Sequence, residues 1–393
     1  MSAVETMMRP TEFDLRAVTT APAFDDLRGD WDDLVRSMRR PSPFLLHGWL
    51  SEWWRHYGQD AALAVHVASR NGKLVGAAPL LVRSRVGVQV TSFLGGDQSA
   101  LGDVLLAPDE DESVAGALLG ASRDGPGYLD VSGLPRGSRL ASTLGSSVEV
   151  VERVEAPVLD LRDGWEAVYR SRTSSKKRNL HRRRRRQLGE LGRLEVVVAR
   201  DLDSLVPALE DAFRLHALRW EGRPDGSDFA SERGRRFQRA ALLRLAEHDI
   251  PRIVLLKLDG RSIAFHYYFA FQGRMIVHRL GFDPAFGRFS PGLVNTLDTI
   301  EAAAAEGLTQ VEFLGGGERY KVELADRFDP LCRALGLARG LRAHALVKAE
   351  LAAMQARLRL KRSSALRRAY FEGLAPLRRI VSRERASAGA SAP

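Results

Sequence analysis

The most informative part of the chain is residues 253–316, which read IVLLKLDGRSIAFHYYFAFQGRMIVHRLGFDPAFGRFSPGLVNTLDTIEAAAAEGLTQVEFLGG. Three strand-like runs are separated by Asp259-Gly260 and Gln272-Gly273, and glycine-containing pairs of this kind favour tight hairpin turns. A run with helical periodicity and a short apolar run, TQVEFLGG, follow. The pattern predicts an antiparallel meander, then a helix, then a strand that leaves parallel to the last strand of the meander.

The first 160 residues repeat this order of elements. Two helix-like runs, FDDLRGDWDDLVRSM and FLLHGWLSEWWRHYG, precede three strand-like runs, and Asn71-Gly72 marks a hairpin turn between the first two. A helix around SVAGALLGASRD and the strand YLDVSGLP complete the series. Two helices likewise precede the meander of the second half, so the order helix, helix, three strands, helix, strand occurs twice.

This order resembles the acyl-CoA N-acetyltransferase (GNAT) fold, here in tandem. The fold class is therefore predicted as α/β (α+β), with each domain a mixed, mainly antiparallel sheet flanked by helices. The predicted parts are an N-terminal GNAT-like domain at 1–162, a basic linker helix at 163–193, a C-terminal GNAT-like domain at 194–340, and a basic helical tail with a disordered end at 341–393.

The composition is that of a globular protein, with 45% apolar and 27% charged residues among 393. A single cysteine, Cys332, excludes a disulfide framework and cysteine-based zinc or iron–sulfur sites. The sequence has no apolar run of the roughly 20 residues that span a bilayer and no export signal at its start. The expected location is the cytoplasm, with a peripheral place at the inner face of the membrane as a further option.

The net charge of +10 is concentrated in two basic islands. Residues 170–186, RSRTSSKKRNLHRRRRR, hold ten basic residues and no acid, and residues 341–385 hold twelve basic residues and three Glu. Such islands indicate an anionic partner, namely a membrane surface, tRNA or a phosphate-rich substrate. A solvated helix surface is the plainer interpretation. Between 346 and 381 an apolar stripe indicates an amphipathic helix, which either packs on the body or contacts a membrane.

The loop between the last meander strand and the next helix is a candidate anion site. Ser290 suits the N-cap position and Pro291 the first helical position, and Gly292 permits close approach of a backbone or ligand. The positive end of the helix would stabilise a phosphate, with Gly287 and Arg288 beside it. A well-capped surface helix is the alternative interpretation.

The segment GGGERYK offers candidate catalytic and substrate-binding residues. Glycines at the end of a strand allow a ligand to come close, and Glu318 and Tyr320 follow as a candidate base and acid. Arg319 and Lys321 are candidates for holding an anionic substrate group. Asp283, at the end of the last meander strand MIVHRLGF, is a further candidate for substrate binding. A glycine loop with a polar helix cap would explain the same residues without a ligand.

Histidine supplies one further catalytic candidate. His266 lies in the middle of the strand SIAFHYYFAF, on the face opposite Phe265 and Tyr267. If it faces a cleft, it is a plausible general base for an attacking amine; a buried structural histidine is the alternative. The remaining histidines show no metal-binding spacing, so no metal is expected.

Several motifs together resemble a known family. The entry PSPFLLHGWLSEWW, GKLVGAAPLL, the basic SSKKRNLHRRRRRQLGELG, GFDPAFGRFSPG and FLGGGERYK are similar to bacterial GNAT-like acetyltransferases associated with cellulose and exopolysaccharide biosynthesis (the CelD-like type). These are in turn related to the Fem aminoacyltransferases of peptidoglycan. The resemblance covers roughly residues 15–330, and the basic tail lies outside it.

The resemblance implies transfer of an acyl group from acyl-CoA, as co-substrate rather than tightly bound cofactor, to an amine or hydroxyl of a small-molecule or lipid-linked sugar acceptor. GRFSPG is only the nearest equivalent of the usual pyrophosphate loop, so other activated donors stay open. Two alternatives remain. One is a Fem-type transferase that uses aminoacyl-tRNA, and the other is a non-catalytic module that binds RNA or a membrane through the basic islands.

Overall fold

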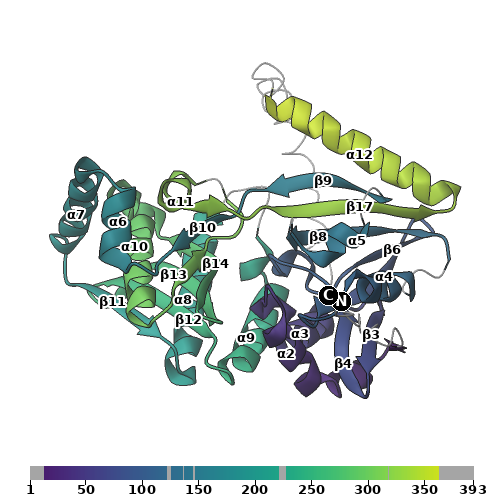
Figure 1. Ribbon diagram of the computed structural model, residues 1–393. Helices are drawn as coiled ribbons and strands as arrows, with labels where there is room; N and C mark the ends of the chain where they lie inside the picture. Colours follow the sequence, from purple (N-terminus) through teal and green to yellow (C-terminus); the bar gives the residue numbers. More distant parts are fainter. Residues whose placement is uncertain are drawn as a thin grey trace, which may run out of the picture. The chain divides into compact units, whose positions relative to one another are not determined.

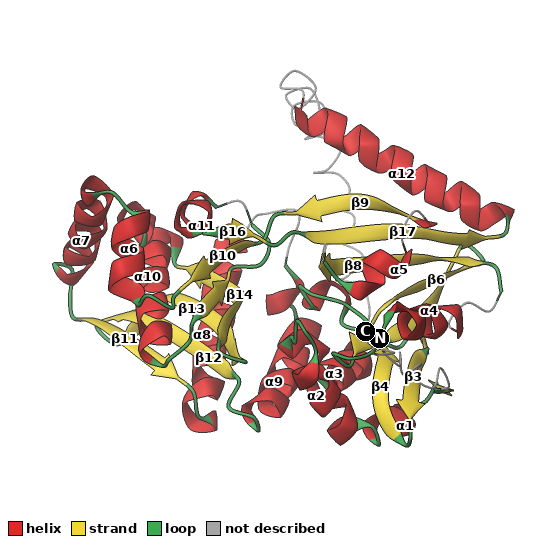
Figure 2. Cartoon of the chain, viewed as in Figure 1, coloured by secondary structure: helices red, strands yellow, loops and turns green. Residues whose placement is uncertain are grey.

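A computed structural model describes residues 13–121, 125–135, 137–144, 147–220, 227–316 and 318–362. The chain divides into two compact units, Met1–Leu337 and Ala338–Pro393. The larger unit combines mixed sheets with flanking helices, so the predicted α/β class is confirmed (Figures 1 and 2). Within the described residues, no helix is both long enough and apolar enough to cross a bilayer.

The sheet of the second half contains the predicted meander. Its strands lie in the order β11 (Leu194–Ala199), β12 (Pro251–Leu258), β13 (Arg261–Phe271), β14 (Arg274–Phe282), β15 (Gln310–Glu312), β10 (Pro157–Asp160) and β16 (Arg327–Phe328). Both predicted hairpin turns form, with positive φ at Asp259-Gly260 and Gln272-Gly273. Strand β15 is parallel to β14, as the sequence predicts.

Helices cover both faces of this sheet, because β13 is apolar on both (Figure 1). Phe265, Tyr267 and Phe269 pack toward α8 (Leu202–Trp220) and α9 (Glu232–Ala246), while Tyr268 packs toward α10 (Pro291–Ala305). The sheet is therefore buried on both sides, and the ends of its strands are the places where a ligand can reach it.

The first half also contains a parallel crossover. Strand β6 (Val88–Phe93) pairs parallel with β8 (Gly127–Pro135), and α4 (Glu112–Ala121) lies between them in sequence. Its predicted meander, however, is divided between two sheets at Pro79, which has no N–H to donate to a strand ladder. In the first of these sheets the strands lie in the order β1 (Asp14–Val18), β3 (Val65–Arg70), β4 (Lys73–Ala78) and β7 (Leu105–Leu106). In the second the order is β2 (Ala62–Leu63), β5 (Leu80–Arg85), β6, β8, β17 (Leu331–Arg339) and β9 (Val148–Val154).

The two halves exchange strands. Strand β10 comes from the first half of the chain but pairs with β15 and β16 in the second sheet. Strand β17 comes from the end of the second half but pairs with β9 in the first. The largest hydrophobic core also draws on both halves, with Trp31 and Trp49 beside Phe213, Phe237 and Phe269. The helices that complete the first half are α1 (Ala21–Asp25), α2 (Arg28–Ser37), α3 (His47–Tyr57) and α5 (Arg139–Leu144).

The basic segment forms two helices instead of the single one expected. Helix α6 (Trp165–Arg172) ends at Thr173, and Ser174 starts α7 (Ser175–Gly189) as an N-cap, its hydroxyl accepting the Lys177 N–H at 3.3 Å. Helix α11 (Arg319–Leu324) follows the glycine segment. In the smaller unit, α12 (Leu341–Arg362) forms the described part of the basic tail; the expected disordered end lies outside the described residues.

Candidate functional site

Strands β14 and β15 separate shortly after they begin to pair. Their parallel pairing runs only from Arg274 to Ile276 on β14. Directly beyond this pairing, Val277 of β14 lies opposite Tyr268 of β13, and Arg279 lies opposite Tyr267. His278, between them, has no partner residue on β13 and forms a β-bulge in β14. Bulges bend a strand and re-aim its side chains. The edge of β14 after Ile276 is therefore open toward the space that β15 has left.

A cavity of about 450 Å³ occupies this divergence, which we call the strand-divergence cavity. Its walls are the end of β14 (277–280), the segment after β15 (313–315), and side chains from α8 and α11. The remaining lining residues are Ala100, His216, Arg219, Ser227, Glu318 and Lys321. The site thus lies at the carboxyl ends of two parallel strands, where the sheet leaves backbone groups exposed.

Two of the predicted site residues meet in this cavity. Glu318 is the N-cap residue of α11, and its carboxylate lies 3.0 Å from the Lys321 Nζ. Burial alone would raise the pKa of Glu318, but the Lys321 ammonium outweighs it and the pKa is lowered. Lys321 is buried and also donates to the Gly315 carbonyl at 3.3 Å. The lysine therefore fixes the carboxylate and keeps it ionised.

The two residues between them point elsewhere. Arg319 is 86% exposed and pairs with Glu323 on the same helix at 2.7 Å. The Tyr320 hydroxyl is shielded from solvent beside Thr296 of α10, and burial raises the pKa of the phenol. Tyr320 thus holds its proton firmly and is not among the residues that line the cavity, so its role as an acid stays a prediction, while Arg319 lies at the surface.

His266 lies in the middle of the sheet, 1% exposed, and is not among the residues that line the cavity. Neither ring nitrogen has a hydrogen-bond partner. Burial, and then the charge of Lys321, lower the pKa of His266 to about 3. The imidazole is therefore neutral at ordinary pH, and its catalytic role stays a prediction.

The candidate anion loop is a 3₁₀ helix, Pro284–Phe289, that leads into α10. Asp283 starts it, accepting the Ala285 N–H at 3.0 Å and pairing with Arg261 at 2.8 Å, so this carboxylate is engaged within the fold. Gly287 and Arg288 are exposed, and the Arg288 guanidinium lies 4.5 Å from the centre of the Phe289 ring. Arg288 is thus the solvent-accessible cation of this loop.

Ser290 and Pro291 take the predicted positions at the start of α10, but with a different cap. Ser290 has φ +53°, and its carbonyl, not its hydroxyl, accepts the N–H groups of Leu293 and Val294. A Cβ on Gly292 would lie 2.9 Å from the Phe282 ring, so packing against Phe282 alone requires glycine there. Whether a ligand also uses Gly292 stays a prediction.

Helix α7 flanks this loop, because it contacts both the 3₁₀ helix and α10. Arg185 pairs with Asp298 of α10, and Lys177 pairs with Glu323 of α11 at 2.8 Å. Among the described residues, no acid pairs with Arg183 or Arg184. The basic helix is therefore partly neutralised by the domain and partly available to an anion.

Sequence reasoning missed a buried chain of hydrogen bonds that ends at His278. Its Nε2 lies 3.2 Å from the Gln238 Oε1, Gln238 donates to Gln98 at 3.2 Å, and Gln98 donates to Asp228 at 3.0 Å. Tyr57 also donates to Asp228, at 2.5 Å. Because an amide oxygen only accepts, His278 must carry its proton on Nε2, which leaves Nδ1 without a partner. Burial lowers the pKa of His278 well below its usual value, so it is neutral.

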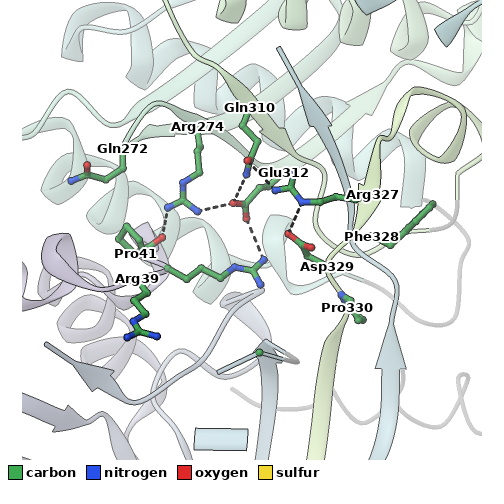
Figure 3. Close-up of a pocket in the computed structure, with 12 residues that line it drawn as sticks. Arg39, Pro41, Gln272, Arg274, Gln310, Glu312, Arg327, Phe328, Asp329 and Pro330 are labelled. Atoms are coloured by element: carbon green, nitrogen blue, oxygen red, sulfur yellow. Dashed lines mark hydrogen bonds and ion pairs between the residues drawn. The ribbon is translucent and has the colours of Figure 1, made fainter. Parts of the chain in front are cut away.

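Two other cavities are larger than the strand-divergence cavity. The larger, about 820 Å³, is lined by arginines, but Figure 3 shows that its acids already pair with them. Arg274 lies 2.6 Å from Glu312, Arg40 lies 3.6 Å from the same carboxylate, and Arg327 lies 3.4 Å from Asp329. The second, about 700 Å³, lies around Trp53 and Asp228. Neither lies at the divergence of β14 and β15, where the sheet leaves backbone groups unpaired.

In the described part of the chain, no group of three or more His, Cys, Asp or Glu side chains is arranged to hold a metal ion. The chemistry available in the strand-divergence cavity is that of a carboxylate, an ammonium, two guanidiniums and neutral imidazoles. These groups can orient a polar substrate, take up a proton and stabilise developing negative charge.

Comparison with known proteins agrees with this geometry. Residues 175–322 match the family model described as an acetyltransferase (GNAT) domain, a range that includes α7 and most of α11. Among solved structures, FemX has a TM-score of 0.58 at 10% identity, with 86% of this chain and 100% of FemX covered. A search of curated protein sequences finds no match.

Two further structures share the fold. The C-terminal domain of a protein named as a lysylphosphatidylglycerol synthetase from Agrobacterium fabrum has a TM-score of 0.53 at 12% identity, with 84% of this chain and 96% of that one covered. L-PGS from Bacillus licheniformis has a TM-score of 0.50 at 13% identity, with 78% and 95% covered. At these identities the structures establish a common fold and leave the substrates open.

Proposed function

We propose, from the premise that the chain is an acyltransferase with a GNAT domain at residues 175–322, that it transfers an acyl group from acyl-CoA or a similar activated donor to an amine or hydroxyl. The acceptor is a cell-envelope or polysaccharide-related molecule, as the resemblance to the CelD-like type implies. The observation that carries the proposal is the divergence of β14 and β15, which opens a cavity lined by residues 277–280 of β14, the strand that leads into α10.

The donor lies along the divergence, with its phosphates at the start of α10. There Arg288 supplies an exposed full charge, and the helix terminus supplies a partial one. The acyl carbonyl then reaches the open edge of β14 after Ile276, where backbone N–H groups can hydrogen-bond its oxygen. Proximity of this kind is the largest contribution that a rigid sheet can make to the reaction.

In the chemical step, the acceptor nitrogen or oxygen attacks the carbonyl carbon, and the carbon–sulfur bond of a thioester donor breaks. Glu318, held beside Lys321 at the cavity wall, takes the proton that the acceptor loses. Tyr320, the candidate acid from the sequence, gives its phenolic proton to the departing thiolate, and the proton that Glu318 took up returns to the phenolate through solvent. His266 remains the alternative base that the sequence proposes.

Titration calorimetry tests the donor site. Acetyl-CoA and a longer acyl-CoA are expected to bind with micromolar affinity at about 150 mM salt. Arg288→Ala is expected to weaken binding about tenfold, because a charge-assisted hydrogen bond to phosphate contributes about 1.5–3 kcal/mol. Arg261→Ala, which removes a neighbouring arginine that pairs with Asp283, is the matched control. If wild type and Arg288→Ala bind acyl-CoA with equal affinity, the phosphates of the donor do not bind at this loop.

A second candidate is an aminoacyl-tRNA donor, as in the Fem-type alternative. It is favoured by α7, which contacts the proposed donor loop and whose Arg183 and Arg184 have no acidic partners among the described residues. The same charges would suit an anionic membrane surface. Binding of tRNA should weaken by about 10³-fold or more between roughly 50 and 200 mM salt, whereas binding of acyl-CoA in the cavity should change far less.

A further inference from the structure

Positive charge exceeds negative charge in the strand-divergence cavity. Glu318 pairs with Lys321, and this leaves the guanidinium groups of Arg219 and Arg279 in the lining. Neither has a carboxylate partner among the described residues. Burial, and then the charge of Arg279, lower the pKa values of His216 and His278, so both imidazoles are neutral. The cavity therefore holds an excess of two positive charges.

Arg279 comes from the sheet itself. It follows the bulge in β14, its Nη1 donates to the His278 carbonyl at 2.9 Å, and its guanidinium lies 5.8 Å from the centre of the Phe229 ring. Burial lowers the pKa of Arg279 to about 10. A guanidinium presents five donors in a planar fork, and a single carbonyl leaves most of them unused. Such a group is costly to bury unless an anion completes it.

Unpartnered polar atoms surround this guanidinium. Tyr267 is the cross-strand partner of Arg279, and its fully buried hydroxyl has no hydrogen-bond partner. His278, 6% exposed, presents Nδ1 without a partner. Buried polar atoms in a folded protein are nearly always paired. His278 and Arg279 line the cavity, and Tyr267 lies beside Arg279 in the sheet, which indicates that a ligand bound at Arg279 supplies a missing partner.

Arg219 adds a second guanidinium from α8. Its Nη1 donates to the Leu280 carbonyl at 3.3 Å, and its guanidinium lies 5.5 Å from the centre of the Phe282 ring. Like Arg279, it is partly buried. The two arginines come from a strand and a helix that pack on each other, so their spacing is fixed by the fold.

We propose that the strand-divergence cavity binds the carboxylate of a small acceptor, an amino acid or a sugar acid, through Arg279 and Arg219. A carboxylate matches the guanidinium fork, because its two oxygens can accept two parallel N–H bonds from one arginine. A volume of about 450 Å³ admits a group of metabolite size. The inference rests on the proposed function, in which the phosphates of the donor lie instead at Arg288.

Ligand-observed NMR tests this assignment without any turnover. The probes are the common α-amino acids and glucuronic acid, each compared with its primary amide, and inorganic phosphate. At least one acid is expected to bind about tenfold or more tightly than its amide. Arg279→Gln should abolish that preference, and Arg279→Lys, which keeps the charge but loses the fork, should restore part of it. The control is Arg236→Gln, an exposed arginine of α9.

Arg219→Gln provides a second variant if Arg279→Gln does not fold, because Arg219 lies near the end of α8 and not within a strand of the sheet. Equal binding of acids and amides, an acid preference that survives in the variants, or no acid binding at all would each overturn the proposal. If inorganic phosphate binds in a way that depends on Arg279 and no acid binds, the proposal of a carboxylate site is wrong and the cavity is a phosphate site. A calorimetric titration with acetyl-CoA distinguishes failure of this proposal from failure of the proposed function. If acetyl-CoA does not bind but the preference for acids is intact, the proposed function is wrong and the carboxylate site is retained.

Discussion

Glu318→Gln is expected to lower kcat by about 100-fold or more, the usual contribution of a positioned general base. The amide keeps the shape of the side chain and its place beside Lys321 but cannot take a proton. Donor affinity should change little, because Glu318 lies at the cavity wall and not at the start of α10. Steady-state kinetics with acetyl-CoA, following the release of free thiol, measures both quantities.

The pH dependence gives a second view of the same residue. Because the pKa of Glu318 is lowered, the base stays ionised below the ordinary glutamate pKa of about 4.3. With a hydroxyl acceptor, which does not titrate in this range, turnover should therefore not fall as the pH drops from neutrality toward that value, as long as the protein stays folded. Glu323→Gln, on the same helix but paired with Lys177 and Arg319, is the matched control. A kcat within about twofold of wild type for Glu318→Gln would assign the base elsewhere.

Trp49→Ala is expected to lower the free energy of unfolding by about 3–5 kcal/mol. Trp49 is fully buried in α3, and its ring meets Phe44, Phe237 and Phe269 edge-to-face at 4.9–5.7 Å. Its indole N–H also donates to the Ser99 hydroxyl at 2.8 Å. The cavity left by its removal would lie between the first-half helices and the second-half sheet.

Urea unfolding followed by circular dichroism and by fluorescence measures this loss. Because the core and the strands cross between the halves, both probes should report one transition. Trp165→Ala, at a partly buried tryptophan stacked on Tyr169, should cost less and serves as control. Two separate transitions, or a loss below about 1 kcal/mol in Trp49→Ala, would contradict a shared core.

Local signals in the sequence predict much of the fold. Asn71-Gly72, Asp259-Gly260 and Gln272-Gly273 all adopt the positive φ angles that their hairpin turns need. Both parallel crossovers follow from an apolar strand, a helix and a second strand in succession. The exchange of β10 and β17 between sheets has no local signal, since strand periodicity shows that a segment is extended and not which edge it joins.

Part of the candidate site could also be predicted from the sequence, and part could not. Glu318 and Lys321 are three residues apart at the start of a helix, so their pairing follows from sequence spacing. The chain from His278 through Gln238 to Gln98 joins residues up to 140 positions apart, which no spacing rule can anticipate. Arg279 in the strand MIVHRLGF could have been recognised from the sequence, because a charged residue within an apolar strand is rarely buried without a partner.

Hydrogen–deuterium exchange with and without acetyl-CoA tests most directly whether acyl transfer takes place where β14 and β15 diverge. The account predicts slower exchange at residues 277–282 of β14 and at the first turns of α10, which would contact the donor. The first-half crossover, β6 to β8, provides the internal comparison and should exchange as before. Protection of that crossover instead, with residues 277–282 unchanged, would contradict the account and move the donor to the first half.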